Sequence, residues 1–388
     1  MKRLLGLQGM GAALLLIGLV IAPARADVVF QETDLVSDGV VPAPVTDPNL
    51  VNPWGVALSS TSPFWVSNNA TGTATLYGVM GSTVTKTNIN PPAGNVVVPP
   101  ASGSGTAAPT GQVANGTANG FIVNGAPAHF IFDSEDGAIS AWSSGPSATI
   151  VKNNAASGAV YKGLAIDNTG GHLYAANFNS GFVEMYDSNF NLMKSVTDPN
   201  LPAGYAPFNT RVLNGQLYVT FALQNGAKHD DVAGPGNGFV DVFNLDGTFN
   251  KRLVSMGNLN SPWGLAIAPS SFGQFAGALL VGNFGDGTIG AYDPNTGAFM
   301  GTLLGANSDP LNLGDLWMLT TGNGAGAGST DAIYFTTGVM NESDGIFGSI
   351  TAVNAPGAAP GAAVPEPGSV LLLLAGLGLF GMIRYRFV

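Results

Sequence analysis

Short runs of β-branched and aromatic residues, separated by Gly, Asn, Asp and Thr, fill most of the 388-residue chain. Apolar runs of this length between turn-forming residues are typical of β-strands. Long stretches with helical periodicity are scarce between residues 27 and 354. We therefore predict an all-β domain over 27–354, with different apolar segments at the two ends of the chain.

One pattern recurs six times in this domain: an apolar strand, a turn ending in Gly, and a returning strand with a large apolar residue five positions after that Gly. The pairs are Gly72 and Tyr77, Gly137 and Trp142, Gly181 and Tyr186, Gly238 and Phe243, Gly287 and Tyr292, and Gly345 and Ile350. Glycine supplies the positive φ of a tight turn, and the fifth position falls on a fixed face of the returning strand. The pattern predicts six equivalent β-hairpins.

Asn or Asp precedes the turn glycine by four positions in five of the six copies. These residues are Asn68, Asp133, Asn177, Asn283 and Asn341. Their side chains can hydrogen-bond the backbone that follows them, as turn residues often do. We expect them in equivalent turns on one face of the domain.

A further short strand precedes the hairpins, with close copies at Gly55–Leu58, Gly163–Ile166 and Gly264–Ile267. Diverged copies are expected around Phe121–Val123, Arg211–Leu213 and Trp317–Leu319. Repeated sheets at this spacing are typical of a β-propeller.

The two ends of the repeat array suggest how the ring closes. The sixth repeat ends with a strand at Gly348–Val353 and lacks a fourth strand, whereas Val28–Leu35 is strand-like and belongs to no repeat. Pairing of these segments would complete the sixth blade and remove an exposed edge. We predict a six-bladed β-propeller closed in this way.

The N-terminus has the pattern of a secretion signal. Lys2 and Arg3 precede an apolar run from Ala12 to Ile21, and Ala24-Arg25-Ala26 provides a small-x-small cleavage pattern. We predict that residues 1–26 are a helical signal peptide, that it is cleaved after Ala26, and that the protein is exported.

The C-terminus combines Pro365-Glu366-Pro367, an apolar run from Val370 to Ile383, and the basic residues Arg384 and Arg386. This order resembles the PEP-CTERM sorting tail of exported bacterial proteins. The resemblance implies processing by an exosortase-type enzyme near the Pro-Glu-Pro motif and a link to extracellular polysaccharide.

The tail also predicts a route to the cell surface. A short transmembrane helix within 364–388 would hold the protein in the inner membrane before processing leaves it at the cell surface or outside the cell. The Ala-, Pro- and Gly-rich segment 355–363 is predicted to be a flexible linker.

The propeller region itself carries a second resemblance. Tyr161–Asp187 resembles an NHL-type propeller repeat, and Pro262–Asp293 follows the same pattern. Over its whole length the domain resembles uncharacterised bacterial proteins with PEP-CTERM tails, through Leu50–Ala57, Leu201–Asn209 and Leu259–Ala266. The resemblance implies an NHL-like propeller and assigns no activity.

Composition narrows the choice of partners. The chain has no Cys, so thiol nucleophiles and thiolate metal sites are excluded. Its formal net charge is −11, which argues against nucleic acid as a partner. Five of its 13 basic residues lie in the predicted signal and tail, so the propeller is more acidic still.

Propellers bind ligands where their inner strands begin. The residues expected at that end of the channel are Asn52, Trp54, Lys162, Asn209, Arg211, Trp263, Asp315 and Trp317. Exposed Trp rings beside amides and carboxylates suit sugar recognition. The open alternative is that the Pro-Trp-Gly sequences at 53–55 and 262–264 pack between blades.

A cation site is the one cofactor to consider, and no other cofactor is expected. The insertion Gln224–Asn237 carries Lys228-His229-Asp230-Asp231, which could help to hold a divalent cation or could form a solvated loop. Glu135 and Asp136 are expected in a solvated hairpin tip.

Sequence motifs of hydrolases are scarce, since Gly-x-Ser-x-Gly and His-Glu-x-x-His are both absent. We therefore favour a non-catalytic binding or matrix module that engages polysaccharide or a protein. The alternative is a metal-dependent propeller enzyme of the lactonase or lyase type.

Overall fold

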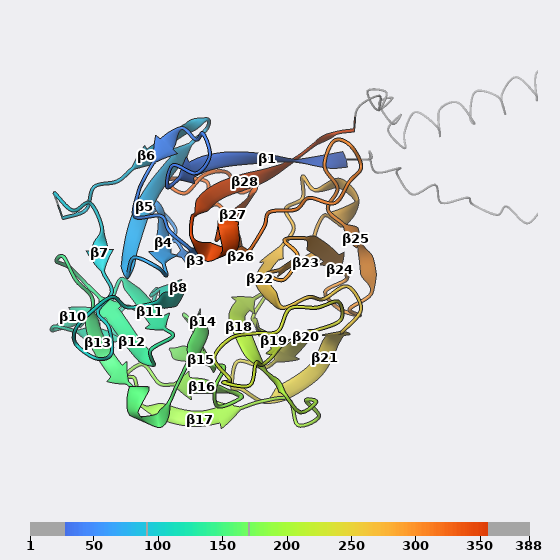
Figure 1. The fold of residues 1–388 in the computed structure, drawn as a ribbon. Helices are drawn as coiled ribbons and strands as arrows, with labels where there is room; N and C mark the ends of the chain where they lie inside the picture. The colour runs from blue at the N-terminus through green and yellow to red at the C-terminus, as the bar shows by residue number, and fades with distance from the viewer. Residues whose placement is uncertain (1–27, 91, 170, 356–388) are drawn as a thin grey trace, which may run out of the picture. The chain divides into compact units, whose positions relative to one another are not determined.

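Six antiparallel sheets stand around a central axis in the computed structural model of the chain, which describes residues 28–90, 92–169 and 171–355 (Figure 1). The inner strands of neighbouring sheets contact one another in sequence around the axis. This arrangement confirms the predicted six-bladed β-propeller. The predicted signal helix and short transmembrane helix lie outside the described residues.

The blades follow one another along the chain. Blade 1 comprises β3 (Pro53–Ala57), β4 (Phe64–Asn68), β5 (Thr73–Met80) and β6 (Thr83–Lys86), with β7 (Val96–Val97) beside β5. Blade 2 comprises β8 (Pro109–Ala114), β11 (Phe130–Ser134), β12 (Ala138–Trp142) and β13 (Thr149–Asn153). Blade 3 comprises β14 (Tyr161–Asp167), β15 (His172–Asn177), β16 (Phe182–Tyr186) and β17 (Leu192–Val196).

The second half of the ring has the same order. Blade 4 comprises β18 (Tyr205–Leu213), β19 (Gln216–Leu223), β20 (Phe239–Phe243) and β21 (Phe249–Ser255). Blade 5 comprises β22 (Pro262–Ile267), β23 (Leu279–Asn283), β24 (Ile289–Tyr292) and β25 (Phe299–Thr302). Blade 6 comprises β26 (Leu316–Thr321), β27 (Ile333–Thr337), β28 (Ile346–Asn354) and β1 (Val28–Ser37), with β2 (Val45–Thr46) parallel to the end of β1.

Smaller elements lie in the connections. They are the hairpin of β9 (Ile122–Val123) and β10 (Ala126–Pro127), two 3-10 turns at Ala155–Ser157 and Gly273–Phe275, and the short helix α1 (Val339–Glu342). No helix within the described ranges is both long enough and apolar enough to cross a membrane.

Blade 6 is closed by the N-terminal strand. β1 pairs antiparallel with β28, from Val28 opposite Asn354 to Ser37 opposite Ile346, with one register shift between Asp34 and Val36. The predicted pairing of Val28–Leu35 with Gly348–Val353 is therefore confirmed, and the first and last parts of the propeller are joined in one sheet.

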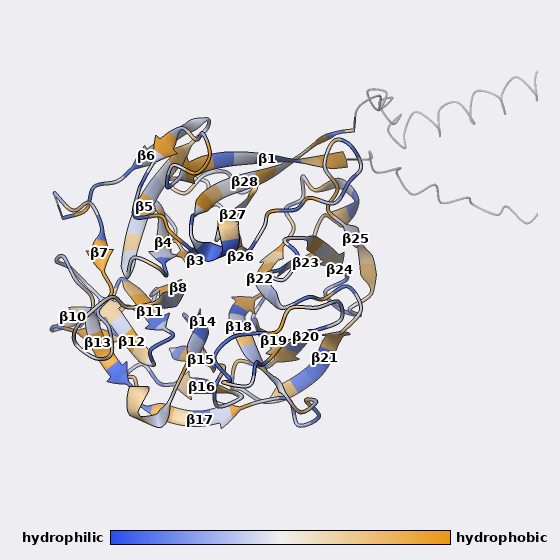
Figure 2. Cartoon of the chain, viewed as in Figure 1, coloured by the Kyte–Doolittle hydropathy of each residue, from blue (hydrophilic) through white to orange (hydrophobic). Residues whose placement is uncertain are grey.

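Apolar side chains hold neighbouring blades together. Among the described residues, five clusters of buried apolar side chains lie between adjacent blades, and a sixth joins blades 6 and 1 and extends across the central channel. The large residue five positions after each turn glycine is buried in all six blades. Figure 2 shows apolar residues along the strands of every blade. The repeated pattern thus places one large side chain per blade in the core.

The predicted turn equivalence holds for three Asn residues and fails for two positions. Asn68, Asn177 and Asn283 each end the second strand of their blade. Asp133 pairs with Ile139 one residue before the end of β11, because the turn from Ser134 to Ala138 is shorter. Asn341 lies in α1, within a longer connection between β27 and β28.

Two of the diverged inner strands also differ from the prediction. Phe121–Val123 leads into the β9–β10 hairpin, and the inner strand of blade 2 is β8. The inner strand of blade 4 begins at Tyr205, so Arg211 lies near its end. Trp317–Leu319 lies in the inner strand β26, as predicted.

Two turn glycines allow a matched test of the hairpin geometry. Gly287 (φ +69°) and Gly181 (φ +80°) share the left-handed conformation, which costs other L-residues about 1–2 kcal/mol. A Cβ on Gly287 would also lie 2.5 Å from the carbonyl oxygen of Gly314, whereas a Cβ on Gly181 would meet nothing within 4 Å. We expect Gly181→Ala to lower the free energy of unfolding by about 1 kcal/mol and Gly287→Ala to lower it clearly more. Urea denaturation measures both, and equal losses would contradict the predicted contact.

Candidate functional site

Three Trp side chains fill the central channel near the end where the inner strands begin. Trp54 and Trp317 stack with ring centroids 3.4 Å apart, and Trp263 stands edge-on to them at 6.1 and 5.7 Å. The Trp263 indole Nε1 donates across the channel to the carbonyl oxygen of Lys162 at 2.8 Å. We call these three residues the tryptophan plug.

The plug residues are buried, each exposing no more than 2% of its surface. The expectation of exposed Trp rings is therefore wrong, and a packing role for the two Pro-Trp-Gly sequences agrees with the structure. The physical reason is that the Trp at the second position of each of the inner strands β3, β22 and β26 meets the other two in the channel, where the three rings cover one another.

Glycine makes the channel narrow enough for this packing. A Cβ on Gly55 would lie 2.4 Å from the carbonyl oxygen of Thr110 in blade 2, and a Cβ on Gly264 would lie 2.7 Å from that of Trp317 in blade 6. Side chains at these positions would force neighbouring inner strands apart.

Lys162 covers the plug at the mouth of the channel. Its ammonium lies 5.2 Å from the centroid of the Trp54 ring, a cation–π contact. It also forms an ion pair with Glu135 and a longer one, at 3.5 Å, with Asp230. A buried cation thus links the apolar plug to carboxylates above it.

Asn52 makes a second link between the plug and the mouth. Its Oδ1 accepts a hydrogen bond from Trp317 Nε1 at 3.1 Å, and its Nδ2 donates to Glu342 Oε2 at 2.6 Å. Asn52 has a φ of +46°, a left-handed conformation that Asn tolerates better than most residues. We call this end, defined by Asn52, Glu135, Lys162 and Glu342, the strand-start mouth.

The carboxylates of the mouth come from turns between the second and third strands of three blades. Glu135 lies in the β11–β12 turn, Glu342 in the β27–β28 connection, and Asp230 in the long β19–β20 connection. These turns lie at the same end of each blade as the start of its inner strand. Residues distant in sequence therefore converge on Lys162.

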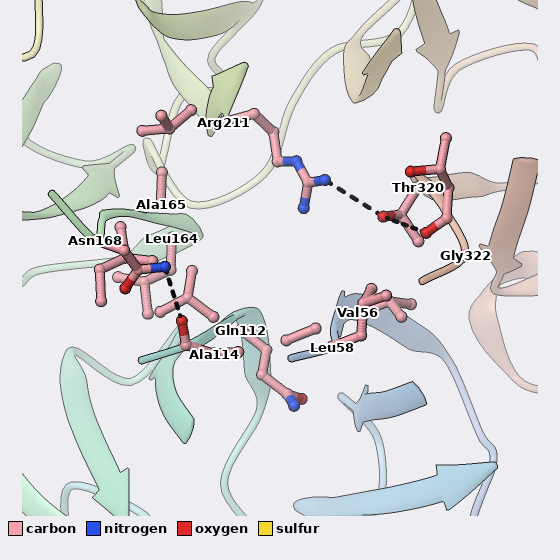
Figure 3. A pocket seen from close by; sticks show the side chains of 15 residues that line it. Val56, Leu58, Gln112, Ala114, Leu164, Ala165, Asn168, Arg211, Thr320 and Gly322 are labelled. Atoms are coloured by element: carbon pink, nitrogen blue, oxygen red, sulfur yellow. Dashed lines mark hydrogen bonds between the residues drawn. The ribbon is translucent and has the colours of Figure 1, made fainter. Parts of the chain in front are cut away.

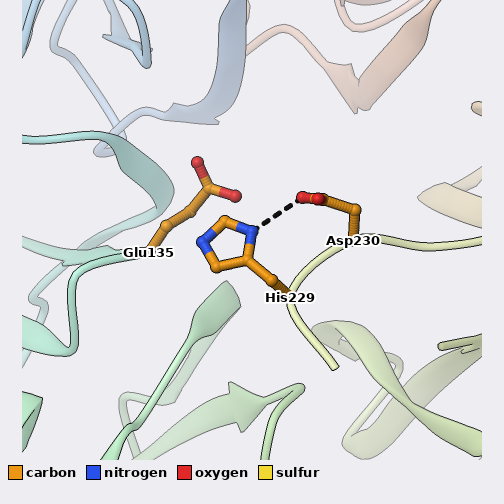
Figure 4. A group of neighbouring side chains, drawn as sticks. All are labelled: Glu135, His229 and Asp230. Atoms are coloured by element: carbon orange, nitrogen blue, oxygen red, sulfur yellow. Dashed lines mark hydrogen bonds and ion pairs between the residues drawn. The ribbon is translucent and has the colours of Figure 1, made fainter. Parts of the chain in front are cut away.

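The insertion in blade 4 reaches the mouth through an ordered turn. Gln224 pairs with Asp231, and the Asn225 backbone N–H donates to the carbonyl oxygen of Asp230 at 2.8 Å. The turn brings His229 Nδ1 to 2.7 Å from Asp230 Oδ1 (Figure 4). Candidate ligand atoms of Glu135, His229 and Asp230 all lie within 4.8 Å of one another.

The charges at the mouth perturb one another. Burial raises the pKa of Glu342 to about 7, helped by the negative charges of Glu135 and Asp315 and opposed by Asn52 and Lys162. Burial also raises the pKa of Asp315. Partial burial would raise the pKa of Asp230, but the hydrogen bond with His229 and the charge of Lys162 together lower it.

The eight predicted site residues separate into four groups. Five of them form the plug or the strand-start mouth, namely Asn52, Trp54, Lys162, Trp263 and Trp317, and Asp315 lies near enough to the mouth for its charge to act on Glu342. Asn209 is buried beneath the mouth, where its Nδ2 donates to the carbonyl oxygen of Trp263 at 2.8 Å. Arg211 lies at the other end of the channel, so its predicted place at the strand-start mouth is wrong.

Sequence reasoning missed two carboxylates of the mouth. Glu135 is not in a solvated hairpin tip, since only 14% of its side chain is exposed and it pairs with Lys162. Glu342 was not considered as a site residue. Their positions in the repeat indicate the site, because the turn after the second strand of a blade lies at the same end as the start of its inner strand.

Comparisons with known proteins identify a sorting motif near the C-terminus and relatives that cover most of the chain. A model of the PEP-CTERM protein-sorting motif matches residues 363–386, which lie outside the described residues. The chain is 33% identical over 350 residues to the uncharacterised protein R648 of Acanthamoeba polyphaga mimivirus, covering 84% of this chain and 82% of the relative. It is 32% identical over 358 residues to the uncharacterised protein L690 of the same virus, covering 84% and 87%.

Solved structures support the fold. Virginiamycin B lyase from Staphylococcus aureus has a TM-score of 0.50 and 12% identity to the chain, covering 84% of this chain and all of that one. The likeness concerns the fold alone at this identity. With the sorting motif, it agrees with the predicted resemblance to PEP-CTERM proteins that have an NHL-like propeller.

The raised pKa of Glu342 predicts how stability depends on pH. A carboxyl group whose pKa is raised in the folded state contributes stability below its unfolded pKa of about 4.3 and loses it as the pH rises through about 7. Glu342→Gln keeps an acceptor for Asn52 but cannot ionise. We expect the variant and the wild type to have similar melting temperatures near pH 4, and the variant to be more stable above pH 7.

Thermal melts of the two proteins from pH 4 to pH 9 measure this difference. The other titrating groups are present in both proteins and largely cancel. A difference that stays constant with pH would show that Glu342 does not titrate as the mouth geometry implies.

Proposed function

The chain belongs to the family that includes proteins R648 and L690 of Acanthamoeba polyphaga mimivirus, and we propose that it is an exported binding module that holds a divalent cation at the strand-start mouth. The bound cation would then engage an extracellular polysaccharide or a protein partner. In this role the protein is a non-catalytic module.

The observation that carries the proposal is the meeting of Glu135, His229 and Asp230. They supply two carboxylates and an imidazole within 4.8 Å, one carboxylate from blade 2 and the other two groups from blade 4. Imidazole nitrogen is a good ligand for Zn²⁺, and carboxylate oxygen is a good ligand for Mn²⁺, so this set of donors suits either cation. The insertion of blade 4 brings His229 and Asp230 close to Glu135.

Lys162 is the positive charge with which a bound cation would compete. Its ammonium pairs with both Glu135 and Asp230, so a divalent cation would share or replace it as their counter-charge. The negative charges of Glu135 and Asp315 both act on Glu342, and these carboxylates keep the mouth acidic. An acidic mouth attracts cations at long range.

The PEP-CTERM motif supports export, a C-terminal sorting signal held in the membrane, and an exosortase-type processing partner. The finer proposal is a signal peptide at 1–26, a propeller at 27–354, a linker at 355–363 and a sorting segment at 364–388. Processing would release the propeller from the inner membrane to the cell surface or the surrounding medium.

One observation favours a second function, a metal-dependent lactonase or lyase. The Glu342 carboxyl has a pKa of about 7 and lies beside Lys162, so it could accept or donate a proton near neutral pH. In that case Glu135, His229 and Asp230 would hold the metal and Glu342 would move the proton.

Cation titration tests the proposed function. We expect Mn²⁺ or Zn²⁺ to raise the melting temperature of the wild-type propeller by mass action. Glu135→Gln and His229→Ala should each weaken binding about tenfold or more, since each removes one of three ligands. Asp309→Asn, an exposed acidic position outside the mouth, is the matched control and should bind as the wild type does.

Equal stabilisation of all four proteins would place cation binding elsewhere and remove the proposed site. Metal-dependent turnover of lactones by the wild type, lost in Glu342→Gln with metal affinity kept, would instead establish the second function.

Tail processing has its own test. Wild-type protein recovered from its native host should begin at Asp27 and end near Val364, as measured by mass spectrometry. Replacing Pro365, Glu366 and Pro367 with Ala should leave Val388 intact and the protein in the membrane fraction, whereas Pro360→Ala in the linker should be processed normally. Wild-type chains that retain Val388 in the extracellular fraction would exclude a sorting role.

A further inference from the structure

A second cavity lies at the opposite end of the channel, where the inner strands finish. It has a volume of about 300 Å³ and is lined by inner-strand residues of blades 1, 2, 3, 4 and 6. None of the three plug residues is among its lining residues, which start at Val56 in blade 1. We call it the Arg211 pocket, after the only residue with an ionic charge in its lining.

Arg211 enters the pocket from the end of the blade 4 inner strand, with Ala165 of blade 3 near it in the lining (Figure 3). Figure 3 shows the guanidinium of Arg211 projecting across the cavity toward Thr320. The other lining residues of the pocket are uncharged, so Arg211 is the one cationic side chain in a lining of aliphatic and neutral polar residues.

The guanidinium has little to bind within the described part of the chain. Its Nη2 reaches Thr320 Oγ1 at 3.5 Å, the limit of a hydrogen bond, and its Nε is buried without a partner. No described carboxylate forms an ion pair with it, and none lines the pocket. Burial lowers the pKa of Arg211 to about 10, so the group stays charged at neutral pH.

An unpaired, partly desolvated cation destabilises a fold, so its presence calls for a compensating partner. A guanidinium donates two parallel hydrogen bonds to a carboxylate with good geometry. The rest of the lining combines aliphatic side chains, among them Leu58, Leu164 and Ile166, with the amides of Gln112 and Asn168. A ligand that fits the guanidinium and the aliphatic part of this lining has one carboxylate and a small apolar body.

We propose that the Arg211 pocket binds a small organic carboxylate, with the carboxylate on Arg211 and Thr320 and the hydrocarbon part against the aliphatic lining. This site is separate from the strand-start mouth and has the opposite charge. It does not depend on cation binding there.

Calorimetric titration with butyrate, butyramide and inorganic phosphate tests the site on the full propeller. Butyrate should bind the wild type at least about tenfold more tightly than butyramide, which has nearly the same shape and no charge. Arg211→Met should abolish butyrate binding and leave the melting temperature equal or higher, because an unpaired charge is replaced by an apolar side chain. Lys194→Met, at an exposed position of β17, is the matched control and should bind butyrate as the wild type does.

Thr320→Val is a second test variant, which keeps the charge of Arg211. It should weaken butyrate binding several-fold. The proposal is overturned if butyrate does not bind the wild type, if Arg211→Met binds it equally well, or if phosphate binds and butyrate does not. A fall in the melting temperature of Arg211→Met with butyrate binding unchanged would show that Arg211 is structural. Loss of cation binding at the strand-start mouth would leave these outcomes unaffected.

Discussion

Pairing of β1 with β28 is the interaction on which the other features of this propeller depend. It joins the two ends of the domain into blade 6 and so lets blade 6 pack against blade 1. The Trp54–Trp317 stack crosses that seam, as do the hydrogen bonds of Asn52 to Trp317 and Glu342. Without closure, Trp54 and Trp317 would lose their stacking contact and Glu342 would lose its hydrogen bond with Asn52. The candidate site is therefore a product of ring closure as much as of any single loop.

Closure also explains why one channel has two chemically different ends. Glycines such as Gly55 and Gly264 let the inner strands approach closely, so the channel is narrow and three Trp rings are enough to fill it. Beyond the plug on one side, turns of three blades supply carboxylates around Lys162. On the other side, the ends of the inner strands supply Arg211 and uncharged aliphatic and polar side chains. The fold thus separates an acidic mouth from a cationic pocket.

Much of this fold could be predicted from the sequence, because propeller blades repeat local patterns. The fifth position after each turn glycine and the unpaired strand at Val28–Leu35 depend on strand alternation and edge pairing, which short sequence windows contain. The site was less predictable. Glu135 and Glu342 reach the mouth through turns whose lengths differ between blades, and a turn shortened by one residue moved Asp133 to another strand position. Arg211 was misplaced because its strand begins at Tyr205, within Leu201–Asn209, whereas the diverged copy of the inner strand was expected around Arg211–Leu213.

Both ends of the channel hold charge that the fold leaves incompletely balanced. At the strand-start mouth, burial and neighbouring carboxylates raise the pKa of Glu342 while Lys162 offsets only part of the negative charge. In the Arg211 pocket, a cation has a weak contact with one hydroxyl. Each arrangement costs stability that six apolar interfaces between blades can bear. Packing alone would favour apolar side chains at both places, and the two proposed ligands, a cation at the mouth and a carboxylate in the pocket, would each supply the opposite charge.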